Sequence, residues 1–383
     1  MTTILLDVTR LVTRLQEGTL PTGVDRVGLA YIQRYGTQAR AVLSERGYSA
    51  VLSESHSQLL FSRLSTSTRK PWATRSLIAR ALATAMLPQR FEHAILLHTS
   101  HSGMEFPRYY RAMTKRNAHP VFMVHDLIPL THAEYCRPGI ADIHRTRIHT
   151  VLRLAKGLIA NSQDTLHALE DEAQRAGLAL PPCVIAHLAP GVSTYPPRPA
   201  PIGTPYFVML GTIEPRKNHW FLLHVWRELV EKYGDAAPKL VIIGRRGWEC
   251  ENVIDMLERC ESIRNVVIEE ANCTDDQLHA WLQHARALLF PSFAEGYGMP
   301  LVEALSSQIP VIASDLGVFH EVAGDVPDYL DPLDGPGWIA RIMAYTEADS
   351  VERSEQLQRV KRFRQPTWDA HFSEVDRFIA ALD

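Results

Sequence analysis

The stretch from Ala285 to Asp315, ARALLFPSFAEGYGMPLVEALSSQIPVIASD, constrains this chain more than any other. Ala287 to Phe290 is a short apolar run typical of a buried strand, and two glycines permit an irregular loop after it. Pro300 suits the first turn of a helix, because its missing N–H would have no partner there and its φ is already helical. The pattern therefore predicts a strand, a loop, a helix and, from Val311, a second strand.

Two carboxylates lie in this unit, Glu295 in the glycine loop and Glu303 in the predicted helix. A helix N-terminus presents free N–H groups and a positive partial charge, so it binds phosphate groups. Carboxylates beside it would accept hydrogen bonds from sugar hydroxyls. Together they predict a pocket for a phosphorylated sugar. Alternatively, Glu303 only complements the helix dipole and Glu295 is a solvated loop residue.

The string FAEGYGMPLVEAL followed by PVIASD resembles the E-x7-E region of retaining glycosyltransferases of family 4, which have the GT-B fold. The resemblance implies that Glu295 faces the donor sugar and that Glu303 bonds the nucleotide ribose. It also implies that the loop between them helps to bind the donor, through Gly296, Tyr297, Gly298, Met299 and Pro300.

Length and composition limit the classes of protein. A chain of 383 residues favours two domains, and 46% hydrophobic with 22% charged residues is typical of a soluble globular protein. A net charge of -3 argues against nucleic-acid binding. Without a long apolar run or a leader-like start, we expect a cytoplasmic protein. Five scattered cysteines without a C-x-x-C pair indicate free thiols rather than disulfides or a zinc site.

The stretch from Pro190 to Pro205 contains six prolines and predicts the domain boundary, because proline at this density continues neither helix nor sheet. We expect an acceptor-binding Rossmann-like domain over 1–195 and a nucleotide-sugar-binding one over 206–365. The GT-B resemblance implies that the last helix, over 366–383, returns to the first domain. The predicted fold class is α/β, GT-B, with two doubly wound sheets facing a cleft.

In the first domain, His125 and Asp126 directly follow the apolar strand Val121 to Val124. Loops at the carboxyl ends of parallel strands line the ligand crevice, although a lone histidine there is often structural. The string HDLIPL also resembles family 4 enzymes of bacterial polysaccharide synthesis. That resemblance implies that His125 meets the donor sugar, with Asp126 behind it.

Two other loops give acceptor-side candidates. The string TGVDRV resembles a T-G-x-x-R-V element of polysaccharide glycosyltransferases, which implies roles for Gly23 and Arg26. His98 and His101 lie three apart, but on an extended segment they would point in different directions, so we predict no metal site. His101 is either an acceptor contact or part of a plain loop.

In the second domain, Arg216 and Lys217 lie between a strand and a helix, where cations would reinforce anion binding. Solvated loop charges are the alternative. The string GTIEPRKN resembles the family's diphosphate-binding element, with Lys217 at its lysine. A later loop, GRRGW, offers Arg245 to the phosphates by the same resemblance. Neither G-x-G-x-x-G nor a Walker A sequence occurs, which counts against NAD enzymes and P-loop ATPases.

Residues 69–90 have the pattern of a basic amphipathic helix. Such a helix either lies on an anionic membrane, as a lipid-linked acceptor would require, or packs as an ordinary surface helix. The first alternative would make the protein peripheral on the inner face of the plasma membrane.

The resemblance implies a retaining hexosyltransferase in O-antigen or capsule synthesis, acting on a glycan or lipid-linked oligosaccharide. Arg216, Lys217 and the helix N-terminus would stabilise the leaving diphosphate, while Glu295 and His125 orient the sugar. We expect GDP-mannose or a related GDP-sugar as donor, with a UDP-sugar as the alternative. No D-x-D motif is present, so we expect no metal and no cofactor. One alternative is a sugar-nucleotide epimerase. Another is a catalytically silent binding subunit; the loss of Glu295, Lys217 or Glu303 would have favoured that second alternative, and all three residues are present.

Overall fold

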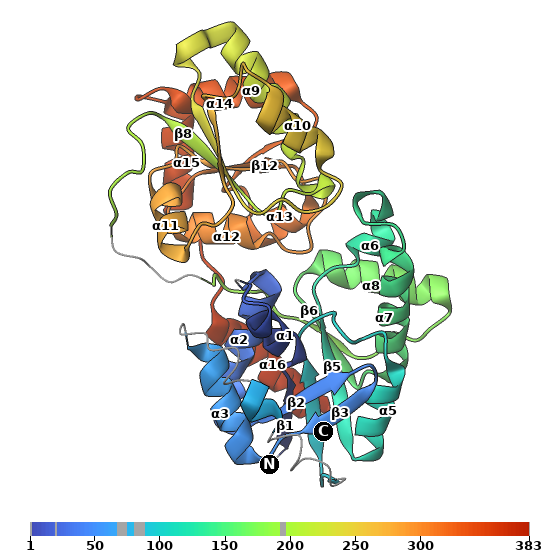
Figure 1. Cartoon of the computed structure of the whole chain (residues 1–383). Coiled ribbons are helices and arrows are strands. Elements are labelled where there is room, and N and C mark those ends of the chain that lie inside the picture. The colour runs from blue at the N-terminus through green and yellow to red at the C-terminus, as the bar shows by residue number, and fades with distance from the viewer. Residues whose placement is uncertain (1, 20, 67–74, 80–88, 192–196, 383) are drawn as a thin grey trace. The chain divides into compact units, whose positions relative to one another are not determined.

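The computed structural model describes residues 2–19, 21–66, 75–79, 89–191 and 197–382. The chain forms two compact units (Figure 1). The first unit comprises Met1–Thr131, Gly139–Gly191 and Thr367–Asp383, and the second comprises His132–Pro138 and Val192–Pro366.

The first unit is built on a seven-stranded sheet in the order β3-β2-β1-β4-β5-β6-β7. All neighbouring strands are parallel except β2 and β3, which form an antiparallel hairpin at one edge. The strands are β1 (Thr3–Asp7), β2 (Arg40–Glu45), β3 (Tyr48–Val51), β4 (Ala94–His98), β5 (Ala118–Val124), β6 (Gly157–Ala160) and β7 (Cys183–Ile185).

Helices cover both faces of this sheet, with α2 and α3 on one face and α5, α7 and α8 on the other (Figure 1). On the second face, apolar side chains of α5, α7 and α8 pack against alternate residues of the strands and form one part of the core. The first face is buried too, through residues such as Ile4 and Leu97 of the strands and Tyr31 of α2. The helices are α1 (Thr9–Gln16), α2 (Gly23–Tyr35), α3 (Glu54–Ser65), α5 (Pro107–Lys115), α6 (Ile128–Thr131), α7 (Ile140–Leu154), α8 (Gln163–Ala176) and α16 (Trp368–Leu382).

The C-terminal helix α16 packs on the first unit. The Tyr31 hydroxyl lies 3.0 Å from Nε2 of His371, and the Tyr35 hydroxyl donates a 2.6 Å hydrogen bond to Asp376. Gly157 opens β6 directly beneath this helix. A Cβ at that position would lie 2.6 Å from the Phe378 ring, so glycine is what allows the helix to approach the strand.

The second unit is built on a six-stranded parallel sheet in the order β10-β9-β8-β11-β12-β13. β10 and β13 are the two edge strands of this sheet. The strands are β8 (Tyr206–Leu210), β9 (Lys239–Ile243), β10 (Val267–Glu270), β11 (Leu288–Phe290), β12 (Val311–Ser314) and β13 (Asp328–Leu330).

The predicted strand–loop–helix–strand unit is present as β11, α12 and β12, and Pro300 lies in the first turn of α12 as expected. Trp226 and Trp338 are among the fully buried side chains of this unit's core. Its helices are α9 (His219–Tyr233), α10 (Glu251–Arg259), α11 (Asp275–Gln283), α12 (Met299–Ser306), α13 (Gly317–Ala323), α14 (Gly335–Thr346) and α15 (Val351–Val360).

The strand order identifies one position in each sheet where ligands are expected. Parallel α/β sheets bind ligands outside the carboxyl ends of the strands, at the point where the order reverses. That point lies between β1 and β4 in the first unit and between β8 and β11 in the second. Two doubly wound α/β units are the predicted fold class; that their sheets face a cleft stays a prediction.

The predicted basic helix over 69–90 falls mostly outside the described residues. Within it, residues 75–79 are helical. Among the residues that the structure describes, none of the helices combines the length and the apolar character that a membrane span requires.

We expect Gly157→Ala to lower the free energy of unfolding by about 1–3 kcal/mol, because the new methyl group would meet Phe378 and Leu382. Urea denaturation measures the change. Gly203→Ala is the matched control, because the space around that glycine is open. Adding Phe378→Leu, which replaces the ring nearest to the new methyl group, should restore part of the lost stability. An unchanged unfolding curve for Gly157→Ala would contradict this packing.

Candidate functional site

A buried ion-pair network occupies the carboxyl end of β8 and β11 in the second unit. Lys217 Nζ lies 2.5 Å from Glu295 Oε1, and Arg216 Nη1 lies 2.8 Å from Glu295 Oε2. The exposed fraction of the side chain is only 10% for Lys217, 18% for Arg216 and 8% for Glu295. The structure therefore brings together three predicted site residues from two neighbouring strands, at the reversal of strand order.

Further contacts fix the shape of this network. Ser292 Oγ donates a 2.8 Å hydrogen bond to Glu295, and Arg216 also contacts Glu214 at 2.7 Å and the carbonyl of Ala294 at 2.6 Å. Two cations thus face two carboxylates, and the formal charges cancel. Glu214 was missed at the sequence level, although it directly precedes Pro215 in the predicted diphosphate element.

The pKa values follow from burial and from this pairing. Burial alone would raise the pKa of Glu295, but the charges of Arg216 and Lys217 and the hydrogen bonds to Lys217 and Ser292 lower it from 4.5 to about 2. Burial lowers the pKa of Lys217, and Glu295 opposes that effect. Glu295 is therefore ionised at neutral pH. It can accept hydrogen bonds, and it does not serve as a proton donor there.

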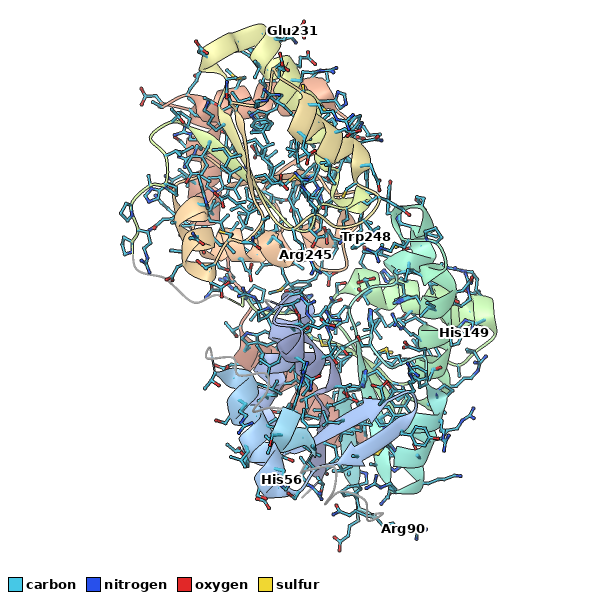
Figure 2. The ribbon with its side chains drawn as sticks, in the orientation of Figure 1. His56, Arg90, His149, Glu231, Arg245 and Trp248 are labelled. Carbon is cyan, nitrogen blue, oxygen red and sulfur yellow. The ribbon has the colours of Figure 1, made fainter. Side chains whose placement is uncertain are left out.

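Glycines allow the loops around the network to approach one another. Gly211, which follows β8, has a φ of +145°, and a Cβ there would lie 3.4 Å from Lys217 Cε. A Cβ at Gly244, after β9, would lie only 1.9 Å from the carbonyl oxygen of Gly211. The next residue, Arg245, is exposed in this loop (Figure 2). Its neighbour Arg246 instead pairs with Glu258 and Glu269.

The glycine loop before α12 follows Glu295 directly. Gly298 has a φ of +97°, and a Cβ there would lie 2.8 Å from the Phe319 ring, so this position requires glycine. Tyr297 is buried, whereas Gly296, Met299 and Pro300 are partly exposed at the start of the helix. Glu303 is partly exposed in the second turn of α12.

In the first unit, His125 directly follows β5 and is buried. Its Nε2 lies 2.8 Å from the carbonyl oxygen of Thr99, and because a carbonyl only accepts, Nε2 must carry the proton. Burial lowers the pKa of His125, while the bond to Thr99 opposes the effect, so the ring is mainly neutral at pH 7. Its Nδ1 is then the ring's hydrogen-bond acceptor.

The other predicted histidine and aspartate shape this loop. His101 Nε2 accepts a 3.0 Å hydrogen bond from the backbone N–H of His125, and its ring packs 5.0 Å from that of His144. Asp126 accepts from the N–H of Ile128 at 3.1 Å. Both side chains are thus engaged in holding the chain at the end of β5. Among the described residues, side chains that could hold a metal ion do not gather in groups of three or more.

The TGVDRV element supplies an interaction that sequence reasoning missed. Asp25 is 1% exposed, and its Oδ1 lies 2.8 Å from Arg10 Nε, while Arg14 Nε lies 3.4 Å from Oδ2. Predicted site residue Gly23 opens α2 and is exposed, and Arg26 Nη1 donates a 3.4 Å hydrogen bond to the carbonyl of Gly191. The sequence did contain a signal for this interaction. Arg10 and Arg14 lie one helical turn apart directly after the first strand, so both could reach the same carboxylate.

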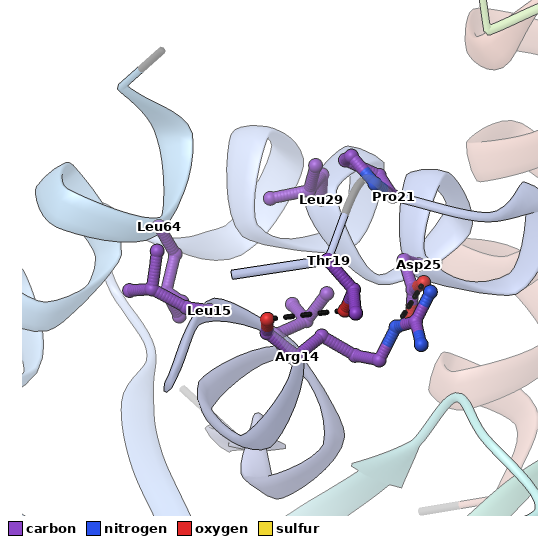
Figure 3. Close-up of a pocket in the computed structure, with 8 residues that line it drawn as sticks. Arg14, Leu15, Thr19, Pro21, Asp25, Leu29 and Leu64 are labelled. Atoms are coloured by element: carbon purple, nitrogen blue, oxygen red, sulfur yellow. Dashed lines mark hydrogen bonds and ion pairs between the residues drawn. The ribbon is translucent and has the colours of Figure 1, made fainter. Parts of the chain in front are cut away.

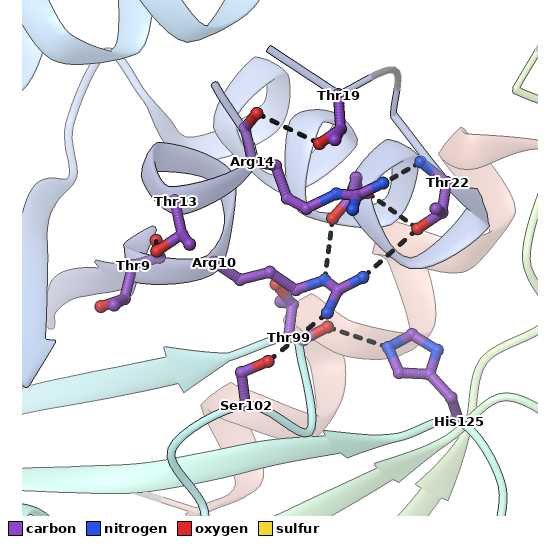
Figure 4. Close-up of polar contacts among 10 residues, drawn as sticks. Thr9, Arg10, Thr13, Arg14, Thr19, Thr22, Thr99, Ser102 and His125 are labelled. Carbon is purple, nitrogen blue, oxygen red and sulfur yellow. Dashed lines mark hydrogen bonds and ion pairs between the residues drawn. The ribbon is translucent and has the colours of Figure 1, made fainter. Parts of the chain in front are cut away.

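Arg10 connects the two elements that meet at the reversal of strand order. Its Nη1 lies 3.4 Å from Ser102 Oγ in the loop after β4, and its Nη2 lies 3.4 Å from Thr22 Oγ1 before α2 (Figure 4). Figure 4 also shows Thr99 and His125 beside these contacts. This polar cluster is the first unit's counterpart of the network around Glu295.

A small cavity lies beside Arg14 and Asp25, lined otherwise mainly by leucines (Figure 3). Its volume of about 30 Å³ is of the size that holds a water molecule. It is therefore a packing gap and is too small for a sugar.

Comparisons with known proteins agree with this arrangement. Residues 197–327 match a family described as "Glycosyl transferases group 1", and this segment includes the whole network around Glu295. The match to this family therefore lies within the second unit and covers about a third of the chain. The predicted assignment to family 4 and the retaining mechanism remain predictions.

Two Escherichia coli proteins are similar in sequence. The serotype-specific mannosyltransferase WbdA is 27% identical over 278 residues, which cover 68% of this chain and 34% of that protein. O-antigen chain mannosyltransferase B is 32% identical over 165 residues, covering 43% of this chain and 42% of that one. The chain therefore aligns with about a third to two fifths of the length of these relatives.

Among solved structures, Anabaena Alr3699/HepE in complex with UDP and glucose matches with a TM-score of 0.68 at 14% identity, over 100% of both chains. Likeness at this identity shows the fold alone. It confirms the predicted GT-B class with two Rossmann-like units.

The pKa of Glu295 gives a prediction for stability against pH. Because folding lowers this pKa from 4.5 to about 2, the ion pairs stabilise the fold fully above pH 4.5, and the contribution is lost as pH falls from there to about 2. Urea denaturation from pH 7 down to about pH 3 should show this loss in the wild-type protein. Glu295→Gln should be less stable at pH 7 and lose less on acidification. Glu374→Gln, which removes an exposed ion pair with Arg377, should lose stability with falling pH as steeply as the wild-type protein. If the free energy of unfolding fell equally steeply with pH in all three proteins, the ion pairs of Glu295 would be contradicted.

Proposed function

We propose that this chain is a retaining glycosyltransferase that moves a hexose, mannose or a related sugar, from a nucleoside diphosphate sugar to a glycan or lipid-linked acceptor. Its place would be in bacterial surface polysaccharide synthesis. The observation that carries the proposal is the buried network of Arg216, Lys217 and Glu295 within the glycosyltransferase group 1 domain. The names of the two Escherichia coli relatives, both mannosyltransferases, support the sugar and the pathway.

The network suits a diphosphate sugar for an electrostatic reason. A diphosphate entering beside Lys217 and Arg216 would compete with Glu295 for the same two cations. As the cations turn to the phosphates, the Glu295 carboxylate would gain free lone pairs, which sugar hydroxyls can fill by donating hydrogen bonds. One exchange of partners would thus bind both halves of the donor.

The same groups would promote the chemical step. When the bond between the anomeric carbon and the phosphate oxygen breaks, negative charge grows on that oxygen. Lys217, Arg216 and the N–H groups at the start of α12 would stabilise it in a site shielded from water. For a retaining transfer, the acceptor hydroxyl would bond to the anomeric carbon on the face that the phosphate leaves, and its proton would pass to the departing phosphate oxygen. Neither a covalent enzyme intermediate nor a metal is part of the proposal.

The first unit would bind the acceptor. The polar cluster around Arg10 lies at the reversal of strand order, where ligands of such sheets bind. His125 lies beside it after β5, and with Nδ1 as acceptor it would meet the donor sugar. Contact of residues 69–90 with a membrane that carries a lipid-linked acceptor is a further proposal, about residues mostly outside the described part of the chain.

The proposed donor is GDP-mannose or a related GDP-sugar, from the resemblance to mannosyltransferases. A UDP-sugar is the second candidate. UDP appears with the structural relative HepE, but at 14% identity that likeness shows only the fold. The nucleotide is therefore decided by the binding experiment.

We expect Lys217→Ala to weaken GDP binding by about tenfold or more, since a charge-assisted hydrogen bond in a buried site contributes about 1.5–3 kcal/mol. Isothermal titration calorimetry with GDP, UDP and their sugar conjugates measures it. Lys232→Ala is the matched control, because that exposed lysine pairs with Glu228 of the same helix, α9, away from the network. Tighter binding of UDP would replace GDP in the proposal. Absence of nucleotide binding by the wild-type protein would contradict it and favour a silent binding subunit.

A further inference from the structure

The first unit contains a cavity large enough for a small ligand, separate from the small gap beside Arg14 and Asp25. Its volume is about 470 Å³, within the usual range of ligand pockets. One face of α1, the turn between β2 and β3, and the loop between β4 and α5 form its walls. The lining residues that carry the argument are Arg10, Arg14, Glu17, Ser44, Arg46 and Phe106.

We propose that this cavity is a subsite for a neutral sugar residue of the acceptor glycan. The inference rests on the proposed function, because the acceptor is what the first unit would bind. It specifies the chemical class of the ligand, which is an uncharged saccharide, and the place in the first unit where that ligand would bind.

Charge balance favours a neutral ligand. Three arginines line the cavity, but Arg10 and Arg14 share the buried carboxylate of Asp25 at 2.8 and 3.4 Å. Arg46 lies 3.5 Å from Glu45, and Glu17 adds a third carboxylate. The formal charges of these six groups cancel. A phosphate ligand would have to displace Asp25, whose side chain is 1% exposed.

The polar groups also match the chemistry of a sugar. Guanidinium groups donate hydrogen bonds, carboxylates accept them, and the hydroxyls of Ser44 and Ser102 do both, as the vicinal hydroxyls of a pyranose require. The Phe106 ring supplies an apolar surface for the C–H face of a sugar. A cavity for an apolar ligand would not gather five charged side chains.

The subsite continues into the polar cluster at the reversal of strand order. Arg10 lines the cavity and also contacts Thr22 before α2. Ser102, which lies 3.4 Å from Arg10 Nη1, lines it as well (Figure 4). A glycan held there would extend from the cluster beside His125, so the cavity suits a sugar residue next to the one that reacts.

The test uses the double variant Glu17→Ala with Arg46→Ala in the full chain. Both side chains are exposed, so their removal should leave the fold intact. The control is Arg111→Ala with Glu170→Ala, which removes one exposed arginine and one exposed glutamate outside the cavity. The probes are the neutral trisaccharide α-mannotriose and, as a phosphorylated lipid, farnesyl phosphate, with binding followed by saturation-transfer NMR and calorimetry.

We expect the double variant to bind mannotriose about tenfold more weakly than the wild-type protein, because charge-assisted hydrogen bonds are lost. The control should bind it normally. Unchanged mannotriose affinity in the double variant would overturn the subsite. So would a double variant that loses farnesyl phosphate binding and keeps the trisaccharide.

GDP binding to the same samples separates this inference from the proposed function. If the wild-type protein binds mannotriose through these residues but no nucleotide, the subsite stands and the transferase proposal fails. If nucleotide binds and the double variant retains mannotriose, the subsite fails and the transferase proposal stands.

Discussion

The second unit depends on one carboxylate held between two cations. Glu295 lies in the loop after β11, and Lys217 and Arg216 lie in the turn after β8, so their ion pairs join two loops where the order of strands reverses. Removing any one partner would leave a charge that is buried and incompletely paired, which is costly. The same pairing keeps two cations in place without excess charge while the site is empty. In the proposed reaction, the diphosphate takes over the cations and the sugar takes over the carboxylate.

The first unit repeats this principle with other residues. Asp25, at the start of α2, lies between Arg10 and Arg14 of α1, again where the strand order reverses. Here the helices carry the charges, and the arginine side chains border a cavity lined by hydroxyls. Because Asp25 is buried and pairs with both arginines, and because hydroxyl groups line the cavity, this site favours a ligand that is itself rich in hydroxyl groups. In the proposed reaction, the second unit would bind the charged donor and the first unit an uncharged part of the acceptor.

The sequence predicted what depends on local pattern. Apolar runs located β5, β11 and β12, and Pro300 with the preceding glycines located the start of α12. The sequence did not predict contacts between residues that are far apart in the chain. Glu295 and Lys217 are 78 positions apart, and they meet because β8 and β11 are neighbours in the sheet. In TGVDRV, the resemblance drew attention to Gly23 and Arg26, whereas burial of Asp25 is fixed by helix packing. Arg245 and His101 are further examples, because a motif does not predict the contacts of a side chain. Arg245 is exposed, and His101 accepts a hydrogen bond from the backbone of His125.

The most direct test of the exchange of partners at Glu295 is the affinity of Glu295→Gln for a nucleoside diphosphate with and without its sugar. Calorimetry would compare GDP and GDP-mannose, or UDP and its sugar conjugate if UDP is the nucleotide that binds. We expect the variant to bind the bare diphosphate as tightly as the wild-type protein or more tightly, because a competitor for Lys217 and Arg216 has lost its charge. The additional affinity that the sugar gives in the wild-type protein should disappear. An equal loss of affinity for both ligands would contradict the exchange of partners and assign Glu295 a purely structural role.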